Sequence, residues 1–222
     1  MIKSVVLGAL LAIIVATGLS VGTAAADDRP AMGGGSGIVV AGPDGELKVN
    51  CTLTTIGNDA AGRLVGMTAA HCGQVGDLIL SETQTDAGVL GRIVSSDETL
   101  DFAVIQFDPN RVIPVNRVGN TTITSVGAPV SFPTIVCKEG RTTGRTCGWV
   151  YGDVFDTRET MTQLCVIEGD SGAPVVVGET LVGMVNAYML VPCIGPEIGR
   201  NMDQILSILS ANGGIGAGFR PI

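Results

Sequence analysis

Short runs of β-branched and other apolar residues, separated by turn residues, follow one another along most of the chain. Turn signals at 43–45 (PDG), 57–59 (GND) and 108–110 (DPN) divide these runs. Strand and turn signals that repeat about every ten residues are typical of all-β sandwiches and barrels. We therefore expect an all-β fold. Its predicted strands cover residues 37–40, 46–55, 63–68, 78–80, 88–94 and 102–107, and then 128–132, 134–137, 148–154, 161–166, 174–177 and 180–187.

Two further patterns organise the chain. Prolines and polar residues between 110 and 120 indicate a connection between two β lobes. Near the end, the stretch 201–211 has the period of one short helix, and the Asn-Gly-Gly at 212–214 ends it. The apolar side chains on one face of this helix are Met202, Ile205, Leu206 and Leu209.

Residues 1–26 have the layout of a secretory signal peptide. Lys3 gives a positive start, 5–16 is an apolar run, and the three alanines at 24–26 form a cleavage site. The alternative is an uncleaved anchor, but the apolar run is shorter than the roughly 20 residues of a membrane span. We expect a protein secreted from the cell or retained at its envelope. The Gly-rich segment 27–37 that follows is expected to be flexible.

Composition excludes several classes of protein. The 222 residues include 13 Lys and Arg against 21 Asp and Glu, a formal net charge of −8, which argues against a nucleic-acid partner. Hydrophobic residues at 45% and charged residues at 15% argue against a disordered chain.

Six cysteines in an exported chain indicate disulfides, although six allow fifteen connectivities. A zinc site is the competing interpretation. However, the sequence has no C-x-x-C pair, and its one histidine stands beside Cys72. We expect neither a metal nor a cofactor.

Three short segments contain the residue types of nucleophilic catalysis. They are 68–72 (TAAHC) with His71, 100–105 (LDFAVI) with Asp101, and 168–174 (EGDSGAP) with Ser171. Each alone has a structural explanation: a packed histidine, the start of a strand, or a turn. Together they supply a base, a carboxylate that orients it, and a hydroxyl that the base can activate.

The residues around Ser171 fit the same hypothesis. Gly172 leaves room for a sharp turn, and the N–H groups of Gly169 and Ser171 are the expected oxyanion hole. Asp170 is expected to be the counter-ion that holds this turn in shape.

The order His, Asp, Ser and these three blocks resemble the chymotrypsin-fold serine endopeptidases, in particular the bacterial secreted group of streptogrisins and α-lytic protease. A fourth block, 136–148, resembles the disulfide-closed hairpin of that group. The resemblance covers roughly residues 37–212. It implies two six-stranded antiparallel β-barrels with the active site between them. The first, 38–115, would hold His71 and Asp101, and the second, 116–222, would hold Ser171, the short helix and the tail.

The resemblance also implies further contacts. The disulfides would be Cys51–Cys72, Cys137–Cys147 and Cys165–Cys193. Lys138, with Arg141 as the alternative, would form a structural ion pair with Asp170. The protein would be a monomer that acts on polypeptides, an exported serine endopeptidase with a Ser-His-Asp acyl-enzyme mechanism.

Two departures from the family pattern leave an alternative open. Ala173 replaces a usual glycine, and Tyr188 stands where the family has glycine in the strand that pairs with substrate. Tyr188 either narrows the pocket or points outward, and Asn186 can still bond Asp101. The candidate substrate-binding residues are Val166, Ile167, Glu168, Val185, Asn186, Ala187 and Tyr188.

No acid stands where trypsin-like relatives place one at the base of the pocket, so a small or medium apolar substrate side chain is expected. A blocked pocket would favour the alternative, a weakly active or inactive relative that binds a peptide or partner in the same cleft. A third hypothesis is an esterase on the same fold.

Overall fold

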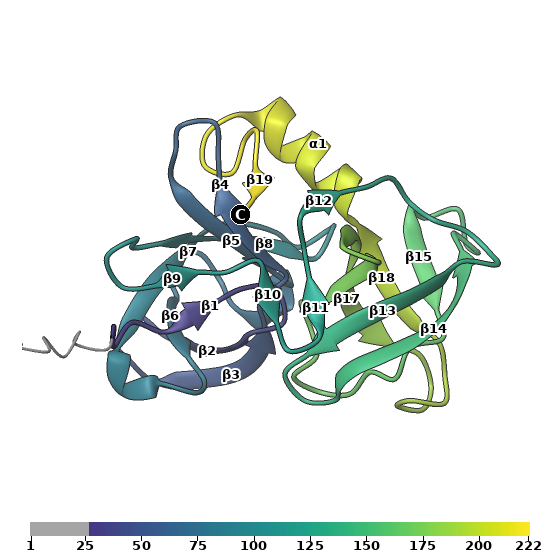
Figure 1. Cartoon of the computed structure of the whole chain (residues 1–222), viewed down its shortest axis with the longest axis horizontal. Coiled ribbons are helices and arrows are strands. Elements are labelled where there is room, and N and C mark those ends of the chain that lie inside the picture. The colour runs from purple at the N-terminus through teal and green to yellow at the C-terminus, as the bar shows by residue number, and fades with distance from the viewer. Residues whose placement is uncertain (1–26) are drawn as a thin grey trace, which may run out of the picture.

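The computed structural model describes residues 27–222, so the predicted signal peptide at 1–26 lies outside the described residues. Two sheets lie side by side, with the helix across one end (Figure 1). The architecture confirms the all-β prediction with one short α-helix.

The first sheet has eight strands in the order β19-β4-β5-β8-β7-β6-β2-β3. Only residues 53 and 54 separate β3, at one end of this order, from β4, which lies beside β19 at the other end, so the chain itself links the two ends of the sheet. We call this sheet the first barrel. The strands are β2 (Gly37–Ala41), β3 (Leu47–Thr52), β4 (Thr55–Asn58), β5 (Leu64–Thr68), β6 (Leu78–Ser81), β7 (Val89–Asp97), β8 (Phe102–Phe107) and β19 (Arg220–Pro221).

The second sheet is a closed six-stranded barrel. The order β17-β16-β13-β14-β15-β18 closes because β18 also pairs with β17, and β12 adds to the outside of β17. Its strands are β12 (Ser125–Val126), β13 (Ile135–Gly140), β14 (Gly144–Gly152), β15 (Glu159–Thr162), β16 (Pro174–Val177), β17 (Thr180–Tyr188) and β18 (Glu197–Asn201).

Two predicted assignments differ from the structure. The strand expected at 128–132 is absent, because Pro129 and Pro133 lack the N–H groups that a ladder needs. The tail, expected to belong to the second lobe, returns instead to the first sheet, where Arg220 pairs with Asn58.

The segment 27–37, expected to be flexible, is packed over part of its length. Strand β1 (Ala31–Met32) runs parallel to β9 (Ile113–Pro114), and the Met32 side chain is 1% exposed. A Cβ on Gly33 would lie 2.4 Å from a backbone oxygen, and one on Gly34 2.5 Å from a side chain. The glycines therefore allow close backbone packing, which composition alone does not distinguish from flexibility.

The remaining short elements lie between and around the two sheets. The two-stranded pair β10 (Arg117–Val118) and β11 (Thr121–Thr122) occupies the predicted connection. Two 3-10 turns, η1 (Ala70–Cys72) and η2 (Thr85–Ala87), belong to the first lobe.

Helix α1 (Met202–Asn212) is close to its predicted range and ends at Gly213, whose φ is +68°. Its buried residues Met202, Ile205 and Leu209 pack with side chains of both sheets, such as Val104 and Met184. The helix therefore helps to fix one barrel against the other. Within residues 27–222, no helix is long and apolar enough to cross a membrane.

The three expected disulfides are present: Cys51–Cys72, Cys137–Cys147 and Cys165–Cys193. Cys51–Cys72 ties β3 to η1, and Cys137–Cys147 joins paired residues of β13 and β14. Cys165–Cys193 links the segment before Ser171 to the segment after β17.

Candidate active site

His71 and Asp101 are brought together at one end of the first sheet. His71 lies on η1 after β5, and Asp101 immediately precedes β8, the partner of β5. The His71 Nδ1 is 2.8 Å from Asp101 Oδ2, and the His71 backbone N–H donates to Asp101 Oδ1 at 2.9 Å. Asp101 has φ +50°, a conformation that aspartate tolerates better than most residues. The carboxylate therefore fixes both the ring and the backbone of His71.

Asn186 of β17 reaches Asp101 from the second barrel, as expected. Its Nδ2 donates to Asp101 Oδ2 at 2.8 Å and to the Asp101 backbone oxygen at 2.7 Å. Its Oδ1 accepts from the Arg200 backbone N–H at 3.0 Å, which leaves the amide one favourable orientation. Both barrels thus position the carboxylate.

These contacts set the charges of the pair. The hydrogen bond to Asp101 raises the pKa of His71 above its ordinary value, although burial opposes this. For Asp101, burial favours the neutral acid, but hydrogen bonds from His71 and Asn186 outweigh it and lower the pKa. At neutral pH the aspartate is therefore ionised and can stabilise a protonated imidazole.

Ser171 lies in a tight turn between Cys165 and β16 and faces the same cleft as His71. This open cleft has a volume of about 410 Å³ and is also lined by Glu168, Gly169 and Arg141. No hydrogen bond joins Ser171 to His71 among the described residues. Bonds of this kind commonly tighten only in the substrate complex.

Gly172 is required by the turn. Its φ is +85°, and a Cβ there would lie 2.2 Å from the Thr52 backbone oxygen. The turn is therefore pressed against β3 of the first barrel.

The expected oxyanion donors are free. Across residues 27–222, neither the Gly169 nor the Ser171 backbone N–H donates to another protein group. By contrast, the N–H of Asp170 donates to the Ile167 oxygen at 3.1 Å. Two free N–H groups around one serine are the arrangement that can stabilise a negative oxygen.

The ion pair expected between Lys138 and Asp170 is present, with Nζ 3.3 Å from Oδ2 and both side chains 0% exposed. Burial lowers the pKa of Lys138, while Asp170 opposes this change. The carboxylate also accepts from the backbone N–H groups of Thr142, Thr143 and Ile167. Arg141, the alternative partner, pairs instead with Glu82 of the first lobe.

Solved structures similar to this chain share its two-lobed architecture. Protease A of Thermobifida fusca has a TM-score of 0.68 and 20% identity, over 86% of this chain and 98% of that one. The Nocardiopsis protease has a TM-score of 0.64 and 22% identity, over 79% of this chain and 95% of that one. The α-lytic protease homolog N4 has a TM-score of 0.64 and 23% identity, over 82% of this chain and 97% of that one. The fold is that of the chymotrypsin-like serine proteases. No protein-family model and no curated protein matches the sequence.

In this chymotrypsin-like fold, the expected substrate-binding residues gather around β17. Val166 and Val185 are buried together with Ala173, and the partly buried Tyr188 packs against their cluster. Ile167 is partly buried, whereas Glu168 and Ala187 are exposed, and Glu168 lines the cleft.

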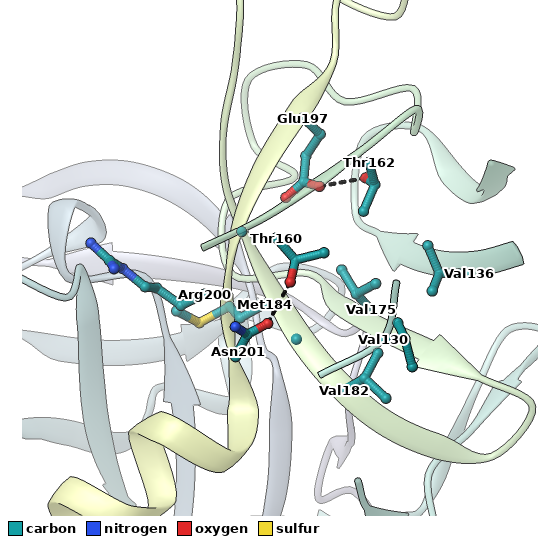
Figure 2. Close-up of a pocket in the computed structure, with 12 residues that line it drawn as sticks. Val130, Val136, Thr160, Thr162, Val175, Val182, Met184, Glu197, Arg200 and Asn201 are labelled. Carbon is teal, nitrogen blue, oxygen red and sulfur yellow. Dashed lines mark hydrogen bonds between the residues drawn. The ribbon is translucent and has the colours of Figure 1, made fainter. Parts of the chain in front are cut away.

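The second barrel also holds a buried acid, Glu197, that no pattern in the sequence indicated. Glu197 lies on β18, opposite Tyr188 of β17 in the strand pairing, and its side chain is 0% exposed. One of its carboxylate oxygens accepts a hydrogen bond from the Thr162 hydroxyl at 2.6 Å (Figure 2). Burial raises its pKa to about 8. Its other oxygen has no hydrogen-bond partner within the described chain, and Glu197 is one of the residues that line a cavity of about 10 Å³, which has room for about one water. Neither His71 nor Ser171 lines this cavity.

No group of three or more His, Cys, Asp and Glu side chains between residues 27 and 222 is arranged to hold a metal ion.

Proposed function

We propose that this protein is an exported serine endopeptidase that uses Ser171, His71 and Asp101. The observation that carries the proposal is the hydrogen-bonded pair His71–Asp101, secured by Asn186, which faces the same cleft as Ser171. The chymotrypsin-like fold supports it, since the similar structures named above are proteases.

In the first half of the proposed reaction, the Ser171 oxygen attacks the carbonyl carbon of a peptide bond. His71 Nε2 takes the hydroxyl proton, and Asp101 stabilises the imidazolium that forms. The carbonyl oxygen becomes negative and is bound by the N–H groups of Gly169 and Ser171. His71 then gives the proton to the amine as the C–N bond breaks, which leaves an acyl-enzyme.

Water completes the proposed cycle. His71 takes a proton from the water that attacks the acyl carbon, and then returns it to the Ser171 oxygen as the acid leaves. The net result is hydrolysis of one peptide bond, and the chain's own residues supply every proton transfer.

Export and an extracellular or envelope location are part of the proposal. Three disulfides support it, since such bonds persist in oxidising compartments. We also propose that the protein acts as a monomer on polypeptide substrates.

A second candidate is a weakly active or inactive relative that binds a peptide in the cleft. The observation that favours it is Tyr188, which packs against the cluster that contains Val166 and Val185 and would narrow a pocket for the substrate side chain there. If the protein is active, the same packing favours small or medium apolar side chains, because the cluster that Tyr188 packs against consists of apolar residues.

Labelling with a fluorophosphonate separates the two candidates. We expect the purified protein to form one adduct on the peptide that contains Ser171, with fluoride released and the hydroxyl proton passed to His71. The urea-unfolded protein serves as the control and should not react, because its serines have no positioned base. Absence of an adduct, or labelling of another serine at a similar rate, would contradict the proposal.

The labelling rate should fall as the pH is lowered. His71 must be neutral to act as a base, and its pKa is raised by Asp101, so half the rate should be lost at a pH above about 6.5. Asp101→Asn should move this midpoint to lower pH, because it removes the carboxylate that raises the pKa. The plateau rate should also fall by about 10⁴-fold. An unchanged midpoint in Asp101→Asn would show that another group controls the rate.

A further inference from the structure

The two expected oxyanion donors belong to peptide groups that are held in different ways. The N–H of Ser171 shares its peptide with the carbonyl of Asp170, which accepts from the Ala173 N–H at 2.8 Å. In a trans peptide the N–H and the C=O point in opposite directions. The chain's own turn therefore fixes this first donor toward the cleft.

The second donor depends on a side chain. The N–H of Gly169 shares its peptide with the carbonyl of Glu168, which accepts from the Thr142 hydroxyl at 2.8 Å. Among the described residues this is the one hydrogen bond that the Glu168 carbonyl accepts. Gly169 has φ +92° and no Cβ to restrict rotation, so the peptide has little else to prevent it from turning over.

The Thr142 hydroxyl is oriented by Arg141, which is in turn held by Glu82 of the first barrel. It accepts a hydrogen bond from Arg141 Nη1 at 3.0 Å, so its own hydrogen is free to point at Glu168. Arg141 in turn donates through Nε to Glu82 Oε2 at 2.8 Å and forms a second bond through Nη2. Glu82 directly follows β6, so this chain of contacts crosses from the first barrel to the second.

A second contact from the first barrel holds the other side of Gly169. The Thr52 hydroxyl donates to the Gly169 carbonyl at 2.8 Å and accepts from the Arg141 backbone N–H at 3.1 Å. With the Gly169 carbonyl held by Thr52, the peptide group between Glu168 and Gly169 is the part of this turn that could still rotate. The Thr142 hydroxyl holds that peptide group through the Glu168 carbonyl.

We propose that Thr142, held by Arg141 and Glu82, is a positioning residue that keeps the Gly169 N–H directed at the oxyanion. The proposal rests on the proposed function for its catalytic consequence, but the orientation of the peptide can be measured without catalysis. On this proposal the Glu82–Arg141 ion pair does more than link the two barrels, because it also orients the Thr142 hydroxyl. The oxyanion hole is then complete only when the first barrel is packed against the second.

The test compares Thr142→Val, which keeps the shape and loses the hydroxyl, with Thr142→Ser, which keeps the hydroxyl. Thr146→Val is the matched control, because Thr146 on the same hairpin donates a similar bond to the Cys165 carbonyl at 3.1 Å. We expect Thr142→Val to lower kcat by about 10- to 100-fold with KM nearly unchanged, since the lost interaction forms in the transition state. Thr142→Ser should recover most of kcat, and Thr146→Val should retain it.

Glu82→Ala tests the link to the first barrel. It should lower kcat less than Thr142→Val does, and adding it to Thr142→Val should cause no further loss, because both changes act on one peptide. Additive losses would show that Glu82 acts by another route.

The amide resonance of Gly169 supplies a measurement that does not depend on activity. With ¹⁵N-labelled protein, Thr142→Val should shift this resonance, while Thr146→Val should not. An unchanged Gly169 signal in Thr142→Val would overturn the positioning proposal even if the parent enzyme is active. A parent that hydrolyses nothing, yet shows the shift, would overturn the proposed function and leave the positioning intact.

Discussion

Ser171→Ala should abolish peptide hydrolysis, lowering kcat by about 10⁴- to 10⁶-fold while the protein stays folded. The large loss is expected because, in the proposed mechanism, the hydroxyl oxygen of Ser171 forms the acyl bond and no other group can replace it. Folding should be unaffected, since the side chain is partly exposed and its hydroxyl has no hydrogen-bond partner among residues 27–222. Hydrolysis of a denatured protein substrate and the thermal unfolding curve measure the two effects.

Two companion variants make this result specific. His71→Ala should lose about as much activity, and the double variant should be no worse than either single one, because the residues act as a unit. Ser207→Ala, which alters an exposed serine on α1, should behave as the parent. A Ser171→Ala protein that cleaves as fast as the parent would remove the basis of the proposed mechanism.

Lys138→Met should destabilise the protein by about 3–5 kcal/mol, because it leaves the buried Asp170 carboxylate without its cation. Methionine keeps much of the apolar stem, so loss of packing contributes little. For a chain of this length, the change corresponds to a fall in Tm of roughly 10 °C. Urea unfolding under non-reducing conditions, followed by fluorescence of the single tryptophan, measures the difference.

The matched comparison uses an ion pair at the surface. Arg29 and Asp27 lie 2.6 Å apart with both side chains well exposed, so Arg29→Met should leave the unfolding midpoint close to the parent value. Lys138→Arg should lose less stability than Lys138→Met, since it keeps a cation beside Asp170. Equal losses in Lys138→Met and Lys138→Arg would mean that the shape of the side chain, and not its charge, matters at this site.

The contacts of the candidate site that agree with the sequence predictions involve residues in short contiguous segments. His71, Asp101 and Ser171 each lie in a short segment whose neighbours form the local turn or strand, so residue type and order were enough to nominate them. The position of Asn186 followed from its offset along the chain from Ser171, and the structure places its amide on Asp101 as expected.

The features that the sequence did not predict depend on partners far away in the chain. Glu197 is buried because β18 closes the second barrel against β17, and a single acid in a short strand carries no sign of that burial. The hydroxyl of Thr142 matters because the turn at 168–171 folds onto its hairpin. The direction of Tyr188 was left open for the same reason, since its packing partners come from several strands.

The short strand β19 joins the last described residues of the chain to β4, near the start of the first barrel. A ribosome makes the N-terminal end first, so β4 has an unpaired edge until Arg220 and Pro221 have been synthesised. Closing so long a loop is entropically costly, and this pairing must therefore follow the more local ones. His71 and Asp101 thus lie on a barrel that is finished only after Ser171 has been made. A chain synthesised only as far as residue 170 therefore lacks both Ser171, the proposed nucleophile, and the last strand of the first barrel.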